Sequence, residues 1–194
     1  MSIISPYAWA GVDIGLDGAL VTIDLSGQIK LNVAPVINPQ FKPKGKKGKG
    51  GKRQPDEVEM KRLLVGMKES YGDILVGLEA AFGMPGQSSV ATCTFCSNYG
   101  LWRGMLVALE IPFFSFRSQE WQRMMFKGIP KSDSKAMARM AAGQLYPNLD
   151  LRKSDRAKKP HEGLVDALLI ARFMQNEFPY SGPVETPKIK RQKQ

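Results

Sequence analysis

Histidine and cysteine are scarce in this sequence, which contains one histidine, His161, and two cysteines, Cys93 and Cys96. A tetrahedral zinc site needs four ligands, and the single histidine lies far along the chain from the Cys-x-x-Cys pair. The scarcity therefore argues against a structural zinc site. Because reduced cysteine is commonly buried, we predict that both cysteines are packed free thiols.

Long apolar runs are also missing. No stretch reaches the roughly 18 consecutive apolar residues that a membrane-spanning helix requires. The N-terminus has no basic segment followed by an apolar run, and no organelle-targeting segment is evident. We therefore expect a soluble, cytoplasmic protein without membrane association. Its 194 residues, 43% of them hydrophobic, suit one ordinary globular domain.

Acidic residues are fewer than basic ones, 18 against 28, which gives a net charge of +10. The excess is local. Lys42–Arg53 contains seven Lys and Arg and no acid, and Val184–Gln194 contains four basic residues against Glu185. The rest of the chain is balanced, with 17 basic (28 − 11) and 17 acidic (18 − 1) residues. This pattern suits basic arms that contact a polyanion, and solvated linkers are the alternative.

The first 36 residues have the pattern of a three-stranded antiparallel meander. Trp9–Gly15 and Ala19–Leu25 are apolar runs separated by a glycine-containing turn, and Gln28–Val36 is a third extended piece. The next segment, Asn38–Pro55, is rich in Lys, Gly and Pro and has almost no apolar side chain to bury. We expect it to be mobile without a ligand.

Helices and strands alternate after Pro55. Val58, Leu63, Leu64 and Met67 have helical spacing, with acids in the first turn. A strand over Ile74–Glu79, a long helix over Ser88–Leu109 and a strand over Ile111–Phe116 follow. Two further helices are predicted over Ser132–Leu145 and Glu162–Asn176, and the chain after Pro179 has the composition of a tail. A meander followed by alternating helices and strands predicts an α/β domain with a mixed sheet.

Four acids stand where a metal site needs them. Asp13 interrupts the apolar first strand, and Glu79 ends another apolar strand. Glu162 and Asp166 are four residues apart at the start of the last helix, so their side chains share one face. Taken singly, each acid also fits an ordinary turn, strand-end or helix-start residue. Together the four predict a site for one or two Mg²⁺ ions, with Mn²⁺ as an alternative, and phosphodiester hydrolysis as the chemistry.

These segments resemble the RuvC-like Holliday-junction resolvases, particularly the short versions of bacteriophages and plastids, over Ala8–Met174. The stretch GVDIGLDGAL resembles the family's first acidic motif, with Ile14 in place of the usual proline. VGLEAAFGMPGQSS resembles the glutamate motif, and HEGLVDALLIA resembles the closing motif, with Glu162 in place of Asp. The resemblance implies an α/β RNase H-like fold with a mixed five-stranded sheet flanked by helices. It places the nuclease domain at residues 1–179, with the basic insertion at 38–55 and a basic tail at 180–194.

The resemblance also implies residue roles. Asp13, Glu79, Glu162 and Asp166 resemble the catalytic carboxylates that hold two metal ions. Phe82 resembles the aromatic that stacks on a base at the opened junction, and a core phenylalanine is the alternative. Lys135 resembles a lysine near the scissile phosphate, a role that Lys131 also fits. His161 resembles the histidine before the last acidic pair, where it orients a water or phosphate or only caps the helix.

The implied substrate is branched DNA, such as a four-way junction in recombination or repair, and the implied assembly is a homodimer with two active sites. Tyr99 and Trp102 on the long helix Ser88–Leu109 suit an isologous interface, although this helix equally suits the core. The basic arm would contact phosphates without sequence preference. Its DNA-binding candidates are Lys44, Lys46, Lys47, Lys49, Lys52 and Arg53.

Two other functions fit the same residues. One is a nuclease of the same fold that acts on flaps or RNA-DNA hybrids. The other is a non-cleaving junction-binding accessory protein, whose acids are only structural. An actin-like or sugar-kinase ATPase also begins with an Asp-Gly strand motif, but that fold needs two such domains and this chain is too short for both.

Overall fold

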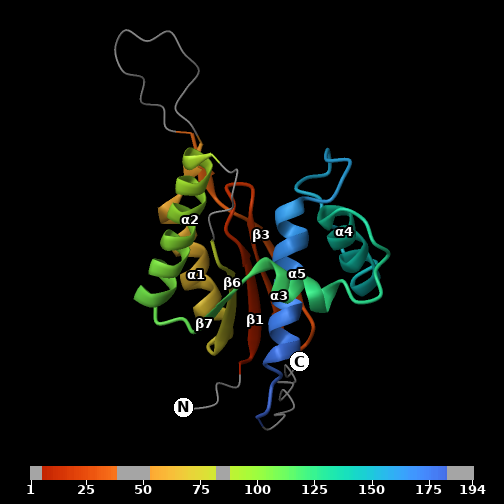
Figure 1. Cartoon of the computed structure of the whole chain (residues 1–194). Coiled ribbons are helices and arrows are strands. Elements are labelled where there is room, and N and C mark those ends of the chain that lie inside the picture. Colours follow the sequence, from red (N-terminus) through yellow and green to blue (C-terminus); the bar gives the residue numbers. More distant parts are fainter. Residues whose placement is uncertain (1–5, 39–52, 82–87, 183–194) are drawn as a thin grey trace.

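The computed structural model describes residues 6–38, 53–81 and 88–182 (Figure 1). A mixed five-stranded sheet with strand order β3-β2-β1-β6-β7 forms its centre. These strands are β1 (Ala8–Asp13), β2 (Ala19–Asp24), β3 (Ile29–Val33), β6 (Ile74–Glu79) and β7 (Phe113–Phe116). β1, β2 and β3 pair antiparallel, whereas β6 pairs parallel with β1 and β7 parallel with β6. The predicted meander and the predicted mixed α/β sheet are both confirmed.

Five helices cover the two faces of this sheet in the described part of the chain. They are α1 (Glu57–Tyr71), α2 (Ser89–Ala108), α3 (Ser118–Met125), α4 (Ser134–Leu145) and α5 (Glu162–Glu177). α1 and α2 lie on one face, and α3, α4 and α5 lie on the other (Figure 1). Ten of the sixteen residues of α5 are buried, so this helix is the centre of its layer.

The strand β1 divides its side chains between the two layers. Ala8, Ala10 and Val12 belong to the core under α1 and α2, whereas Trp9 belongs to the core under α5. Successive side chains of a strand point to opposite faces. Asp13 therefore lies on the α5 face, in the same row as Trp9.

The ends of the predicted elements shift by one or two residues in most cases, but three departures are larger. In α1 the buried residues are Met60, Leu64 and Met67, while Val58 is 61% exposed. The helix α3 is absent from the sequence prediction, because its eight residues hold only two buried apolar anchors, Trp121 and Met125.

The third departure is at the end of the segment that we expected to be mobile. Gln54–Pro55 forms a two-residue strand, β5, that pairs with β4 (Val36–Ile37). Backbone hydrogen bonds, rather than burial of apolar side chains, order this end of the segment. Residues 39–52 and the predicted tail beyond residue 182 lie outside the described part of the chain.

The predictions for the side chains of α2 are corrected. Cys93 and Cys96 are exposed free thiols rather than packed ones. Trp102 is 1% exposed and lies in the core, because Asn98, Trp102 and Leu106 form the buried stripe of this helix at a spacing of four residues. The half-buried Tyr99 donates a hydrogen bond to Ser115 Oγ, at 3.1 Å. Trp102 is therefore a core residue, whereas Tyr99 stays partly exposed and its place in an interface remains a prediction.

Among the described helices, none has the length and apolar character that a membrane span requires.

Candidate active site

The parallel pairing of β1 and β6 brings the first two acids together. Val12 is opposite Leu78 in the register, so the next residues, Asp13 and Glu79, end their strands at the same edge of the sheet. Leu75 of β6 belongs to the core under α5, and Glu79 is four residues further along the strand. Both acids therefore face α5 from adjacent strand ends.

The third acid, Asp166, lies on α5, and this helix packs directly on the backbone of β1. A Cβ at Gly11 would lie 2.1 Å from Ala167 O, and a Cβ at Gly163 would lie 2.3 Å from Asp17 O. Only glycine permits this approach at either position. The close contact at Gly11 and Gly163 brings Asp166, which lies between Gly163 and Ala167 in sequence, to the end of β1.

Asp13 is half-buried, and the loss of solvation raises its pKa from 3.8 to about 6. The backbone N–H of Gly15 donates to Asp13 Oδ1 at 3.1 Å and lowers the pKa, while the charges of Glu79 and Asp17 raise it. The pKa of Asp166 rises from 3.8 to about 7, first through burial and then through the charges of Asp13, Glu79 and Glu162. The charges of these carboxylates thus repel one another, as the charges of acids that share a cation site do.

Glu79 is held from α3. Ser118 Oγ donates a hydrogen bond to Glu79 Oε1. Burial raises the pKa of Glu79, whereas the Ser118 hydroxyl and the Trp121 indole N–H lower it. Trp121 Nε1 is buried without a hydrogen bond of regular geometry in the described residues, so its effect on Glu79 is the weaker of the two. Because β7 ends opposite Glu79, the chain enters α3 beside this carboxylate.

Glu162 lies at the exposed rim of the same site. Its side chain is 49% exposed and pairs with Lys135 Nζ at 2.5 Å and with Arg139 Nη1 at 3.5 Å. Lys135 and Arg139 are four residues apart on α4 and so share one face of this helix. The charge of Lys135 also lowers the pKa of Asp166. The structure thus places Lys135 at the carboxylates.

The remaining candidates lie around this rim or outside the described residues. Lys131 is exposed and precedes α4. His161 caps α5, since its Nδ1 accepts a hydrogen bond from the Leu164 backbone N–H at 3.3 Å. Arg53 binds both carboxylate oxygens of Asp17, at 2.8 and 3.2 Å. Outside the described residues lie Phe82, Lys44, Lys46, Lys47, Lys49 and Lys52.

The donor set fits a hard divalent cation. All four acids supply carboxylate oxygens, which Mg²⁺ prefers, and Asp13 and Asp166 are half-buried with raised pKa values that a cation would lower. Within residues 6–38, 53–81 and 88–182, no three His, Cys, Asp or Glu side chains form a ready-made metal cage. Mg²⁺ commonly binds through one or two carboxylates with waters and substrate phosphates, so it does not require such a cage.

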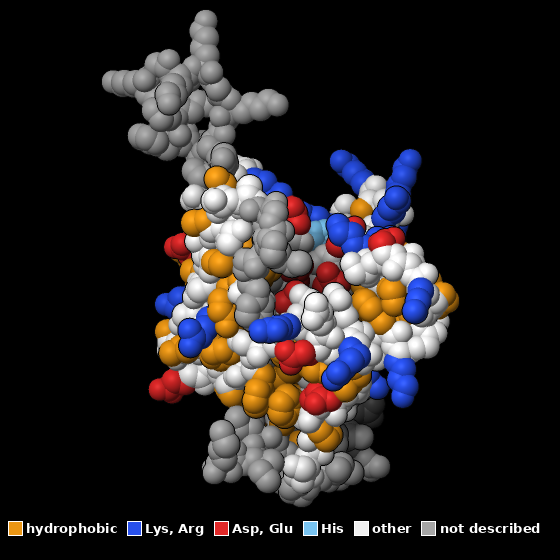
Figure 2. Space-filling model, in the orientation of Figure 1, with side chains coloured by type: hydrophobic (Ala, Val, Ile, Leu, Met, Phe, Trp, Pro, Cys, Tyr) orange, Lys and Arg blue, Asp and Glu red, His pale blue; other side chains and the backbone are white. Residues whose placement is uncertain are grey.

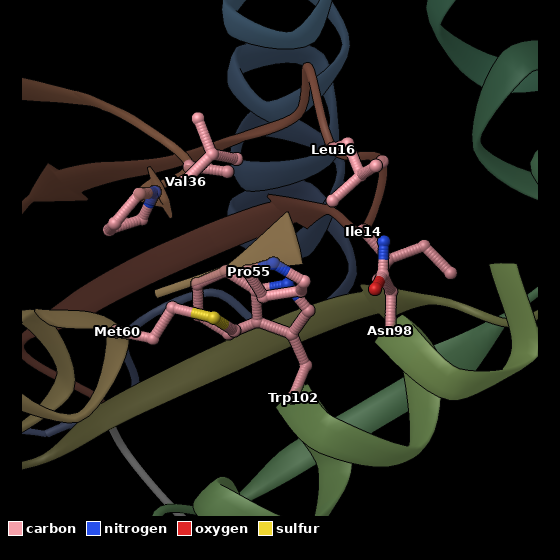
Figure 3. Close-up of a pocket in the computed structure, with 10 residues that line it drawn as sticks. Ile14, Leu16, Val36, Pro55, Met60, Asn98 and Trp102 are labelled. Carbon is pink, nitrogen blue, oxygen red and sulfur yellow. The ribbon is translucent and has the colours of Figure 1, made fainter. Parts of the chain in front are cut away.

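A small pocket lies next to the turn after Asp13, on the opposite face of the sheet from α5 (Figure 3). Ile14 and Leu16 of this turn line it together with Asn98 and Trp102 of α2. It has about 10 Å³ of space for a water-sized sphere, about what one water molecule needs. Since it lies under α1 and α2, this pocket is separate from the carboxylates on the α5 face.

Sequence reasoning missed several residues of the site. Ser118 and Trp121 were not predicted because helix α3 was not predicted. The four-residue spacing of Trp121 and Met125 is the only sequence signal for this helix. Arg139 stands four residues after Lys135, a spacing that is visible in the sequence. Asp17 and Lys153 are brought to His161 by the fold, and no local pattern marks either of them.

Comparisons with known proteins identify the fold. No protein-family model matches the chain, and no curated protein matches it in sequence. The chain is similar to the solved structure of T. thermophilus RuvC in complex with a Holliday junction substrate, with 13% identity and a TM-score of 0.51. That match covers 89% of this chain and 93% of the other. The predicted RNase H-like fold is therefore confirmed.

Two further structures match with lower TM-scores. A structure of Thermus thermophilus RuvC has 14% identity and a TM-score of 0.45, over 88% of this chain and 96% of that one. The yeast mitochondrial Holliday junction resolvase has 16% identity and a TM-score of 0.46, over 89% of this chain and 79% of that one. At identities this low, structural similarity shows the fold alone. The catalytic roles of individual residues therefore stay predictions.

Proposed function

We propose that this protein is a metal-dependent endonuclease that resolves branched DNA, in particular four-way Holliday junctions. The observation that carries the proposal is the meeting of Asp13, Glu79 and Asp166. They come from three separate elements, and each is half-buried at one end of the sheet with a raised pKa. Burying carboxylates that repel one another destabilises the folded state. We therefore expect that a function, rather than stability, explains why these three acids lie together.

The chemistry proposed is hydrolysis of a phosphodiester bond. Divalent ions bound by these carboxylates would supply an activated water and stabilisation of the leaving oxygen. Glu162, at the open rim, is suited to share such an ion with the substrate. Lys135 and Arg139 hold Glu162 in place and add positive charge where a scissile phosphate would approach.

The proposed substrate follows from the fold and from the charge around the site. A RuvC that shares the fold has been solved with a Holliday junction substrate. Basic side chains gather beside the recess that holds acidic side chains (Figure 2). Phosphate contacts of this kind recognise the placement of the DNA backbone rather than its sequence, which suits a branched structure.

Two cuts at symmetry-related positions of a junction require two active sites. We therefore propose that the protein acts as a homodimer. The exposed face of α2 is suited to form its interface. Gly100 and Gly104 lie in a hollow of about 450 Å³ with Tyr99, Arg103, Val107 and Ala108. Small residues allow two helices to approach closely, and Val107 is 61% exposed.

The test is cleavage of a synthetic four-way junction in Mg²⁺. Wild type should give paired, symmetric nicks, and it should leave flaps, RNA-DNA hybrids and linear duplex much less cleaved. Glu79→Gln and Asp166→Asn should each lower the rate by at least about 100-fold, because each removes a carboxylate that would hold a metal ion against the reacting phosphate.

The matched control is Asp73→Asn, which changes an exposed acid at the other end of the sheet. It should cleave like wild type. If wild type binds junctions without nicking them, or if both site variants cleave at the wild-type rate, the proposed activity is wrong.

A further inference from the structure

The loop between α4 and α5 carries a second concentration of positive charge. Its exposed basic residues are Arg152, Lys153, Arg156, Lys158 and Lys159, and the only acid among residues 152–159 is Asp155. The Arg152 guanidinium donates hydrogen bonds to the Asp150 carboxylate, with N···O distances of 2.7 to 3.1 Å. In the described part of the chain, no ion pair involves the other four basic residues. The loop therefore presents four uncompensated cations against one acid.

This loop is fixed next to the carboxylates. The His161 backbone N–H donates to Leu151 O at 2.7 Å, which closes the loop at its base, and the buried Leu151 anchors it in the core. A turn in which Ala157 N–H donates to Ser154 O, at 2.9 Å, shapes its tip. His161 then begins α5, so the loop ends one residue before Glu162.

An open hollow of about 400 Å³ lies between this loop and the β1–β2 turn. Lys153 and Lys159 line it from the loop, Asp17 lines it from the turn, and His161 and Glu162 line its floor. Since Glu162 also belongs to the carboxylate site, the hollow adjoins that site and shares this residue with it. Figure 2 shows the basic side chains over this part of the molecule, beside the acidic recess.

The charges that line the hollow favour an anion. Asp17 is bound through both oxygens by Arg53, and Glu162 is bound by Lys135 and Arg139. Each acid of the hollow is thus already matched by a base, and Lys153 and Lys159 contribute two positive charges beyond that balance. Lys153 is close enough to influence both Asp17 and His161 electrostatically.

We propose that this hollow binds the phosphodiester backbone of one DNA strand within a few nucleotides of the cleaved bond. The inference rests on the proposed function and adds a strand-binding site to it. An extended polyanion suits the loop better than an isolated phosphate does, because Arg156 and Lys158 continue the positive charge beyond the two lysines of the hollow. Lys153 and Lys159 are separate in sequence from the lysines of the basic arm at residues 42–52, and Arg53, at the end of that arm, contributes to the hollow only by binding Asp17.

The first experiment measures how junction binding depends on salt. Lys153→Ala/Lys159→Ala is compared with wild type in a Glu79→Gln background, in Mg²⁺, between about 50 and 200 mM salt. Removing two phosphate contacts should reduce the log-log slope by about 1.4 to 1.8, since each contact contributes about 0.7 on single strands and 0.9 on duplex DNA. Because both lysines are exposed, the melting temperature should not change.

The matched control is Lys30→Ala/Lys61→Ala, which changes the net charge equally. Lys30 lies towards the far end of the sheet from Asp13, and Lys61 is exposed on α1, across the sheet from α5. This control should keep the wild-type slope. An unchanged slope in the Lys153/Lys159 variant, or an equal fall in the control, would overturn the inference.

The second experiment locates the contact. A neutral methylphosphonate replaces each phosphate in turn, over several nucleotides on either side of the cut. Wild type should bind more weakly when the replacement falls at the few positions that the hollow contacts, and the Lys153/Lys159 variant should show no further weakening there. Equal weakening of both proteins at every position would disprove this placement. Failure of the proposed function would look different, because wild type itself would then neither nick nor selectively bind the junction.

Discussion

At the scale of single residues, the half-buried acids make the protein's stability depend on pH in an unusual direction. Burial and mutual repulsion raise the pKa of Asp13 to about 6 and that of Asp166 to about 7, from 3.8 for both. The folded state therefore binds more protons than the unfolded state between about pH 4 and 7. The contribution of these residues to stability is full below about pH 4 and is lost as pH rises to about 7.

Asp166→Asn should therefore stabilise the metal-free protein at about pH 8 while it removes nuclease activity. The amide keeps the shape of the protonated acid without its charge, and we expect a gain of about 1 to 3 kcal/mol in the free energy of unfolding. The gain should vanish near pH 4. Denaturant unfolding in EDTA across this pH range measures it, with Asp73→Asn as a control that should change little. A variant less stable than wild type at the higher pH would contradict the electrostatic account.

The positions of the acids were predictable from the sequence, because a carboxylate inside an apolar strand or on one helix face is a local signal. The sequence left Lys131 and Lys135 as alternatives, and the helix geometry of α4 is what brings Lys135 to Glu162. Ser118 could not be predicted as a partner of Glu79. That contact depends on the parallel pairing of β6 with β7, two strands that are separated in the chain by the whole of α2.

At the scale of elements, α2 shows how periodicity predicts a helix more reliably than it predicts the helix's exposed face. The predicted bounds of Ser88–Leu109 nearly match the observed Ser89–Ala108. Apolar and small residues occur all round this helix, so the choice of buried face depends on which side meets the sheet. Trp102 consequently lies in the core, and Cys93 and Cys96 lie outside it.

Gly104→Arg tests whether the exposed face of α2 forms the proposed dimer. A Cβ at Gly104 meets nothing within 4 Å in the described structure, so one chain can accommodate the substitution. A partner helix packed on this face would clash with the new side chain. We expect wild type to have the mass of a dimer in sedimentation or light scattering, and the variant to have the mass of a monomer with unchanged helix content.

Gly143→Arg on α4 provides the matched control, because this glycine is also exposed and open around its Cβ. It adds the same charge and the same bulk elsewhere on the surface and should leave the mass unchanged. A wild type that is monomeric at micromolar concentration, or a Gly104→Arg variant that remains dimeric, would contradict the proposed interface.

At the scale of the whole molecule, the net charge of the sequence does not show where the positive surface of the folded protein lies. The sequence outside the two basic segments is balanced at 17 basic and 17 acidic residues. The fold nevertheless gathers Lys153 and Lys159 at the site end, while acids such as Asp73 lie at the other end of the sheet. A sum along the chain could not predict this separation, since it depends on how the elements pack.

The basic arm at residues 42–52 can be tested at this scale by replacing it with a Gly-Ser linker of equal length, which removes six lysines. We expect weaker junction binding and a log-log salt slope that is smaller by about 0.9 for each phosphate of duplex DNA that the arm neutralises. Replacing the same six lysines by arginine keeps the charge and should keep the slope. Because Arg53 remains bound to Asp17, the linker variant preserves the described end of the segment. If the linker variant keeps the wild-type slope, the arm does not touch DNA, and the positive charge that attracts the backbone must come from the folded body or from the basic tail at residues 180–194.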